Sequence, residues 1–227
     1  MTANDPTPAS AIVLAGGQSR RLGHDKRLLR LWGSSGPTLL ERTITTVGAL
    51  CAEVVVVLND PERWPTLPAR CVGDSFPDGG ALGGIYSGLV AVTNQYALVV
   101  ACDMPLLNPQ LLAAMLALPR GYDLLVPRSP APGSARNGLD LEPLHAIYSK
   151  ACLEPMRSAL ERGQRQISAL FPSLHVAYLE RAQIARHDPQ GHSFLNINTL
   201  AQMADAERLL GRAGRATSVS ARPAPGG

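Results

Sequence analysis

The run "AEVVVVLN", residues 52–59, decides the fold class because it is apolar at successive positions. Side chains of a strand alternate between the two faces of its sheet, so a strand without a polar face must be covered on both sides. Similar apolar runs lie at residues 11–14 and 98–102, and segments with helical spacing lie at 39–50 and 82–92. Such alternation of strands and helices predicts crossover units and a mainly parallel sheet. We therefore expect an α/β fold, a three-layer Rossmann-like sandwich.

The rest of the chain continues this alternation up to a closing helix. Residues 128–143 are rich in proline, glycine and serine and predict a long loop, a kind of segment that often carries function. An amphipathic segment at residues 199–211 predicts the closing helix, with Gly211 as its stop. The other expected elements are a helix at 109–118, a strand at 122–127, a strand or short turn leading into a helix at 144–163, and a strand at 174–180.

Length and composition indicate one globular domain. The chain has 227 residues, of which 45% are hydrophobic and 17% charged. This composition is typical of a folded protein, and the length allows one substantial core. We expect a single domain over residues 11–211, a flexible N-terminus at 1–10 and a disordered tail at 212–227.

The charge pattern argues against nucleic-acid partners. The formal net charge is +3, and the final segment alone carries three arginines and no acidic residue, which leaves the body near neutrality. A basic stripe with interleaved aromatic residues, as expected of a nucleic-acid interface, is absent from the sequence. The sequence also shows neither a signal peptide at its start nor an apolar run of roughly 18 residues, so we predict a cytoplasmic protein without a membrane segment.

The cysteines are scattered and form no C-x-x-C pair. Three of them lie in or beside apolar runs, where a thiol behaves as a small core side chain. Buried thiols are therefore favoured over a metal site or disulfides for Cys51, Cys71, Cys102 and Cys152.

A glycine-containing loop follows the first predicted strand, in "VLAGGQSRRLGHDK" at residues 13–26. Gly16 and Gly17 would let backbone N–H groups approach a ligand closely, and Arg20, Arg21 and Lys26 add cations. The loop matches neither a P-loop nor G-x-G-x-x-G. On these residues alone it is either an anion-binding loop or an ordinary strand-to-helix turn with a solvated cationic face.

Asp103 ends the apolar strand "ALVVACD". A buried carboxylate at the carboxyl end of such a strand is costly unless it meets a cation or a water-filled cleft. This position suits a Mg²⁺ ligand, because magnesium takes few protein carboxylates alongside phosphate oxygens and waters. The alternative is a strand-end cap with no chemical role.

Four stretches in order resemble one enzyme family. The run "LAGGQSRRLGHDK" resembles the signature L-A-G-G-x-S-x-R-x-G-x-D-K of the nucleotidyltransferases that attach a nucleotide to molybdopterin, above all the molybdenum cofactor guanylyltransferases. The stretches "GDSFPDGGALGGIYSGL", "VVACDMPLL" and "FLNINTLAQM" resemble three further motifs of that family. Ala81 stands where the family usually has proline, and the 128–143 loop is longer than expected. The resemblance implies the fold of the nucleotide-diphospho-sugar transferase type, with the N-terminal half binding nucleotide and the C-terminal half binding the acceptor.

The resemblance also implies roles for individual residues. Lys26, Arg21 and Asp103 would be catalytic, with Lys26 at the α-phosphate, Arg21 at the other phosphates and Asp103 on Mg²⁺. The nucleotide would be bound by Leu14, Ala15, Gly16, Gly17, Lys26, Asn59, Asp74 and Asp103. Asn196 and Asn198 would lie on the acceptor or metal side, although Asn198 or Thr199 could equally be the N-cap of the last helix.

The activity implied by the resemblance is transfer of GMP from Mg-GTP to molybdopterin carrying molybdenum, with release of pyrophosphate. The second glycine, Gly16, favours guanine, because cytidylyltransferases of this family usually have alanine there and glycine leaves room for a purine edge. The alternatives are cytidylyl transfer, transfer to a sugar phosphate or a related anionic acceptor, and a catalytically silent nucleotide-binding domain. The implied partners are GTP, molybdopterin or molybdenum cofactor, and proteins that deliver or accept the cofactor.

Overall fold

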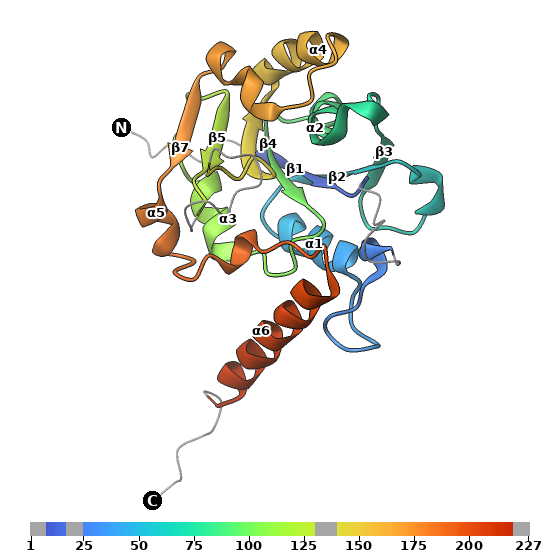
Figure 1. The fold of residues 1–227 in the computed structure, drawn as a ribbon, viewed down its shortest axis with the longest axis vertical. Helices are drawn as coiled ribbons and strands as arrows, with labels where there is room; N and C mark the ends of the chain where they lie inside the picture. Colours follow the sequence, from blue (N-terminus) through green and yellow to red (C-terminus); the bar gives the residue numbers. More distant parts are fainter. Residues whose placement is uncertain (1–7, 17–24, 130–139, 220–227) are drawn as a thin grey trace, which may run out of the picture.

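A central seven-stranded sheet organises the protein, as a computed structural model shows for residues 8–16, 25–129 and 140–219 (Figure 1). The strand order is β3-β2-β1-β4-β6-β5-β7. Strand β6 runs antiparallel to its neighbours β4 and β5, and the other pairings are parallel. The strands are β1 (Ala9–Leu14), β2 (Glu53–Leu58), β3 (Arg70–Gly73), β4 (Tyr96–Ala101), β5 (Leu124–Pro127), β6 (His145–Ser149) and β7 (Val176–Leu179). The expected mainly parallel sheet is confirmed.

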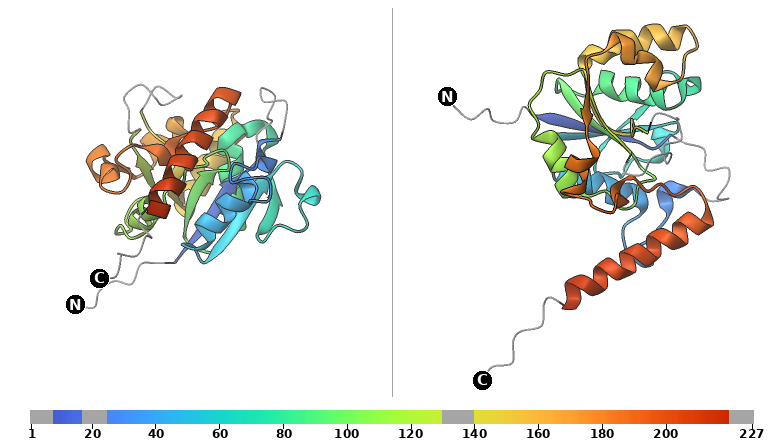
Figure 2. Two further views of the ribbon diagram at one scale, coloured as in Figure 1. Left: turned by 90° about the horizontal axis from the view of Figure 1, so that it is seen from below. Right: turned by 60° about the vertical axis from the view of Figure 1, so that its left-hand side comes forward.

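Helices cover both faces of this sheet, which confirms the three-layer α/β fold. The right-hand view of Figure 2 shows α2 and α4 above the sheet and α1 and α3 below it, with α6 projecting from the body. The α-helices are α1 (Leu39–Gly48), α2 (Gly80–Ala91), α3 (Pro109–Leu116), α4 (Leu153–Glu161), α5 (Arg181–Ala185) and α6 (Leu200–Val219). Short 3₁₀ helices include η1 (Lys26–Leu28) and η2 (Pro61–Arg63), which flank the candidate site. The remaining ones are η3 (Pro77–Gly79), η4 (Lys150–Cys152), η5 (Ile167–Ser173) and η6 (His192–Phe194).

Two large apolar clusters form most of the core, one on each face of the sheet. Along β1, Val13 belongs to the cluster under α1 and α3, whereas Ile12 belongs to the cluster under α2 and α4. Strands β2 and β4 alternate in the same way, with both faces buried. Burial of both faces explains why "VVVV" and "ALVVA" lack polar positions.

Helix α2 lies very close to the sheet because small residues face it. A Cβ added to Gly88 would stand 2.5 Å from Ile12 Cγ2, and one added to Gly84 would stand 3.2 Å from Leu14 Cδ2. Glycine at these positions therefore lets the helix backbone approach β1. This approach brings the first turn of α2 to the carboxyl edge of the sheet, where the candidate site lies.

Both chain ends differ from the predictions. Helix α6 continues through Gly211 to Val219, so Gly211 is not its stop and residues 212–219 are not a disordered tail. A glycine inside a helix costs only about 1 kcal/mol, and the neighbouring alanines and arginines are good helix formers. At the other end, Ala9 and Ser10 are buried in β1, which begins before residue 11. The rest of the expected N-terminal and C-terminal segments, residues 1–7 and 220–227, lie outside the described residues.

The four cysteines are free thiols, as predicted. Cys102 and Cys152 are buried, whereas Cys51 and Cys71 are half-buried, so the expectation of full burial holds for two of the four. Burial raises the pKa of the Cys102 thiol to about 12, which keeps it protonated and unreactive at neutral pH. Throughout the described ranges, every helix is too short or too polar to cross a bilayer.

Candidate active site

The candidate site is a cleft at the carboxyl edge of the parallel strands. Leu14 pairs in register with Val57 of β2 and with Ala101 of β4, so the residues after these three strands meet at one edge. Ligands of open α/β sheets bind at such an edge. The cleft has a volume of about 290 Å³. It is lined by Leu14, Gly16, Lys26, Arg27, Val57, Asn59, Asp74, Pro77, Gly80, Ala81, Gly84, Ala101, Cys102, Asp103 and Leu144.

Most of the predicted nucleotide-binding residues meet in this cleft. Its lining includes Leu14, Gly16, Lys26, Asn59, Asp74 and Asp103. Ala15 does not line it, because its side chain is buried and its N–H donates to the carbonyl of Val57. Gly17 and Arg21, as well as the neighbouring Arg20, lie outside the described residues.

Lys26 contacts two other predicted site residues. Its Nζ lies 3.1 Å from Asp103 Oδ2 and 2.8 Å from Asn198 Oδ1. The side chains of Lys26 and Asp103 are 16% and 22% exposed, so the ion pair is largely sheltered from water at the floor of the cleft. Three segments that are distant in sequence therefore meet at the Lys26 ammonium group, namely η1, the loop after β4 and the residues before α6.

The two asparagines before α6 have different surroundings. The side-chain oxygen of Asn198 accepts a hydrogen bond from Lys26 Nζ, and the Nδ2 of Asn198 is buried without a hydrogen-bond partner in the described part of the chain. The Asn196 side chain donates to the carbonyl of Phe194 and does not line the cleft. Thr199 Oγ1 accepts the N–H of Gln202, so Thr199 caps α6 and Asn198 is left for the site.

Asp74 joins the cleft to the start of α2. Its Oδ1 accepts hydrogen bonds from the N–H of Phe76 and from Ser87 Oγ, both at 2.9 Å. Ser87 is buried on α2, which ties the carboxylate to the helix that lies closest to the sheet. Asp74 is thus held in one orientation at the wall of the cleft.

Asn59 lies directly over Gly16. Its Nδ2 donates to the carbonyl of Gly16, and a Cβ added at position 16 would stand only 2.7 Å from Asn59 Oδ1. The sequence suggests that glycine leaves room for a purine edge. In the structure the Asn59 amide occupies the space that a side chain at position 16 would need. Because Gly16 has no Cβ, the amide can lie there.

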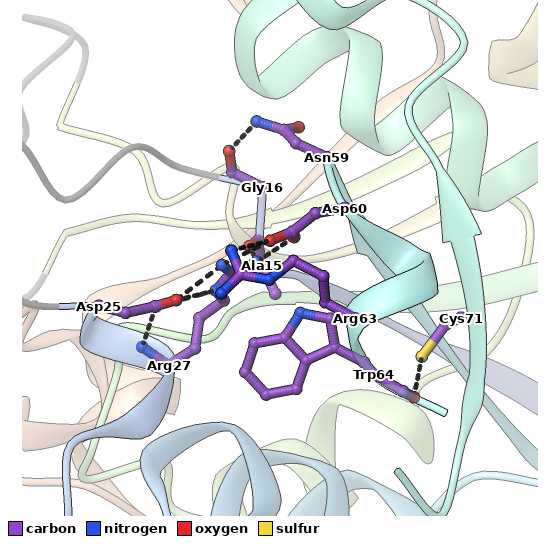
Figure 3. Close-up of polar contacts among 9 residues, drawn as sticks. All are labelled: Ala15, Gly16, Asp25, Arg27, Asn59, Asp60, Arg63, Trp64 and Cys71. Atoms are coloured by element: carbon purple, nitrogen blue, oxygen red, sulfur yellow. Dashed lines mark hydrogen bonds and ion pairs between the residues drawn. The ribbon is translucent and has the colours of Figure 1, made fainter. Parts of the chain in front are cut away.

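Sequence reasoning missed the group of charged residues around Arg27. Its guanidinium lies between the carboxylates of Asp25 and Asp60 and against the Trp64 ring, 4.8 Å from the ring centroid (Figure 3). Hydrogen bonds from Arg27 lower the pKa of both carboxyl groups below the usual value. The motif quoted above includes Asp25, but Asp60 is 33 residues from Arg27 and no sequence pattern connects them.

The donor set suits a metal held mainly by its ligand. The described residues contain no group of three or more His, Cys, Asp or Glu side chains placed to hold an ion. Asp103 is one carboxylate facing a cleft, and magnesium accepts one or two protein carboxylates when phosphate oxygens and waters complete its shell. The arrangement therefore fits Mg²⁺ that arrives with a nucleotide.

The fold and the match to a family model identify the chain as a nucleotidyltransferase. Residues 11–178 match the model of the MobA-like NTP transferase domain, and the chain belongs to this family. It is 47% identical over 191 residues to a probable molybdenum cofactor guanylyltransferase of Chloroflexus aggregans, covering 84% of this chain and 89% of that protein. It is 33% identical over 207 residues to the molybdenum cofactor guanylyltransferase of Desulfosudis oleivorans, covering 91% and 97%.

Solved structures agree with this family. The chain is similar to the molybdopterin-guanine dinucleotide biosynthesis protein A of Archaeoglobus fulgidus, with a TM-score of 0.73 and 26% identity over 89% of this chain and 99% of that one. It also shares the fold of the 2-C-methyl-D-erythritol 4-phosphate cytidylyltransferase of Thermus thermophilus, with a TM-score of 0.63 and 22% identity over 88% and 98%. The second likeness shows the fold alone and confirms the expected nucleotide-diphospho-sugar transferase type.

Proposed function

We propose that this protein transfers GMP from Mg-GTP to molybdopterin carrying molybdenum and releases pyrophosphate. The observation that carries the proposal is the meeting of Lys26, Asp103 and Asn198 at one point of the cleft, at 3.1 and 2.8 Å. The relatives named above as guanylyltransferases support the choice of reaction, since they align over more than four-fifths of the chain. Cytidylyl transfer in the same cleft is the alternative that the test has to exclude.

Nucleotidyl transfer is mainly a matter of positioning and electrostatics. The Lys26 ammonium would face the α-phosphate and the bridging oxygen, on which negative charge grows as the bond to pyrophosphate breaks. Asn198 holds this ammonium from the side of α6, and Asp103 holds it from the side of β4. When bound, Mg²⁺ would neutralise phosphate charge beside Asp103. In the nucleotide complex Lys26 would exchange its contact with Asp103 for one with phosphate.

The other lining residues suit the remaining parts of the nucleotide. Asn59 and Gly16 at the ends of β2 and β1 offer amide and backbone groups to the base and ribose, and Asp74 stands on the side of α2. Leu144 enters the cleft from the start of β6, which belongs to the expected acceptor half. We assign the acceptor to this side, next to Asn198. Arg21 and Gly17 keep their proposed phosphate roles from the family resemblance. A cytoplasmic location, and partner proteins that deliver or accept the cofactor, stay predictions.

The test is a direct assay of the purified protein. Each of the four nucleoside triphosphates is supplied with Mg²⁺ and molybdopterin, and pyrophosphate release is measured together with the dinucleotide product. We expect GTP to support turnover and the other nucleotides to support little. Faster turnover with CTP would refute the guanylyl assignment, and absence of turnover with every nucleotide would favour a silent nucleotide-binding domain.

A further inference from the structure

Arg27 lines the cleft and joins three segments of the chain: its own, the end of β1 and the segment around η2. Its Nε lies 2.9 and 3.0 Å from the two oxygens of Asp25, and its Nη1 and Nη2 lie 2.5 and 3.1 Å from the two oxygens of Asp60. The Arg27 side chain is only 12% exposed, and it stacks on Trp64 just after η2. Its Nη1 also lies 3.5 Å from the carbonyl of Ala15, at the end of β1.

The two residues of the Arg27–Asp60 contact are each next in sequence to a residue that lines the cleft. Arg27 directly follows Lys26, and Asp60 directly follows Asn59. The bond between Arg27 and Asp60 therefore ties together the two backbone segments that carry Lys26 and Asn59 into the cleft. We propose that Arg27 is a positioning residue that fixes the distance between Lys26 and Asn59 through its two-point contact with Asp60. This inference rests on the proposed function, because it takes Lys26 and Asn59 to act on the nucleotide.

Arg27 itself is unsuited to bind phosphate, although it lines the cleft. Two carboxylates already take up its guanidinium, each through two oxygens, and the outer face of Asp60 meets a second arginine, Arg63, at 3.2 Å. Two arginines thus face two aspartates, and the group as a whole offers no excess positive charge. The group fixes geometry, because a planar guanidinium paired with a carboxylate sets the relative orientation of the two side chains as well as their distance.

A lysine at position 27 should therefore impair both turnover and GTP binding. Lysine keeps the charge but makes a single-point contact, so η1 could shift relative to β2. A misplacement of about 1 Å at a reacting group can cost on the order of 100-fold in rate. We therefore expect Arg27→Lys to lower kcat by about 100-fold, and to raise the Kd for GTP by about 10-fold as Lys26 and Asn59 lose their relative placement.

The decisive experiment is a double-mutant cycle on the full chain. Wild type, Arg27→Lys, Lys26→Ala and the double variant are compared for kcat with saturating GTP, for Kd of GTP without acceptor, and for thermal stability. If Arg27 acts through Lys26, adding Arg27→Lys to Lys26→Ala should change kcat by less than about 2-fold, because coupled sites are non-additive. A full further fall in kcat in the Lys26→Ala background, or wild-type kcat and Kd in Arg27→Lys, would overturn the proposal.

Two further variants serve as a control and as a substitute for Arg27→Lys. Arg63→Ala is the matched control, because Arg63 touches the same carboxylate from outside with a side chain that is 70% exposed, and it should leave kcat and Kd unchanged. Asp60→Asn replaces Arg27→Lys if the latter fails to fold, and the same non-additivity with Lys26→Ala is expected. A wild type that binds GTP but transfers nothing would refute the proposed function, while the Kd measurements would still test the role of Arg27.

Discussion

At the scale of single residues, Lys26 bears the largest share of the proposed chemistry. An ammonium beside the α-phosphate is attracted more strongly in the transition state than in the ground state, so its loss should lower turnover more than binding. Removing one such donor from a preorganised site typically costs about 100-fold to 1,000-fold in rate. We predict a fall of this size for Lys26→Ala in kcat at saturating GTP, with partial recovery in Lys26→Arg.

The chain offers a matched control for this change. Lys150, the other lysine of the sequence, follows the far end of β6, and its N–H donates to the carbonyl of Gln95 at the opposite edge of the sheet. Lys150→Ala should therefore leave kcat within about 2-fold of wild type, as expected of a change remote from the site. Near-normal turnover in Lys26→Ala would mean that another cation faces the α-phosphate.

A second prediction at this scale concerns Gly16. The methyl group of alanine would come within 2.7 Å of Asn59 Oδ1 and push the amide away from the Gly16 carbonyl. If Asn59 and Gly16 together form the base pocket, Gly16→Ala should weaken GTP binding by about 10-fold or more, the effect of roughly one lost hydrogen bond to a ligand. Calorimetric titration with GTP and with CTP measures the change. Equal weakening of both nucleotides would count against a role in base selection.

At the scale of elements, the contact of α2 with β1 determines the shape of the cleft wall. Alanine at position 88 would place its Cβ 2.5 Å from Ile12 Cγ2 in the core, and overpacking of this kind typically costs about 1–3 kcal/mol. We predict that Gly88→Ala lowers the free energy of unfolding by this amount, although alanine is the better helix former. Urea unfolding measures it as a lower midpoint with an unchanged slope.

The helix α6 supplies the control for Gly88. A Cβ added to Gly211 would meet no atom within 4 Å, so Gly211→Ala changes helix propensity alone. It should stabilise the protein by up to about 1 kcal/mol. If both alanine variants shift the midpoint in the same direction, backbone propensity and not the contact with Ile12 controls the effect at Gly88.

At the scale of the whole molecule, the sequence predicts what depends on local pattern. Runs of adjacent apolar residues predict the strands at "IVL", "VVVVL" and "ALVVA", and the structure confirms the expected sheet. The cleft lies at the carboxyl ends of these strands. The end of α6 at Gly211 was wrongly predicted, because one glycine is a weak stop signal when good helix formers follow. The Arg27–Asp60 contact was missed because it joins residues that only the folded chain brings together.

His145 is the described histidine whose pKa is shifted most clearly by burial. The imidazole lies in the core against Phe194 and is fully buried, and neither nitrogen has a hydrogen-bond partner in the described ranges. Burial lowers the pKa of His145 from 6.5 to about 3, so the folded protein holds it neutral. In the unfolded chain the same group takes up a proton below pH 6.5.

The last prediction follows from this difference and concerns global stability. The pKa of His145 is lower in the folded protein than in the unfolded chain, so its burial in the neutral form lowers stability only as the pH falls from 6.5 toward 3. Over this range the free energy of unfolding decreases by at most about 1.4 kcal/mol per pH unit. We predict that the free energy of unfolding falls by up to about 2 kcal/mol between pH 6.5 and 5. His145→Leu should remove this slope, whereas His175→Leu, at an exposed position, should keep it. Urea titrations of the three proteins at several pH values measure the slopes, and a wild-type slope in His145→Leu would show that other groups cause the acid sensitivity.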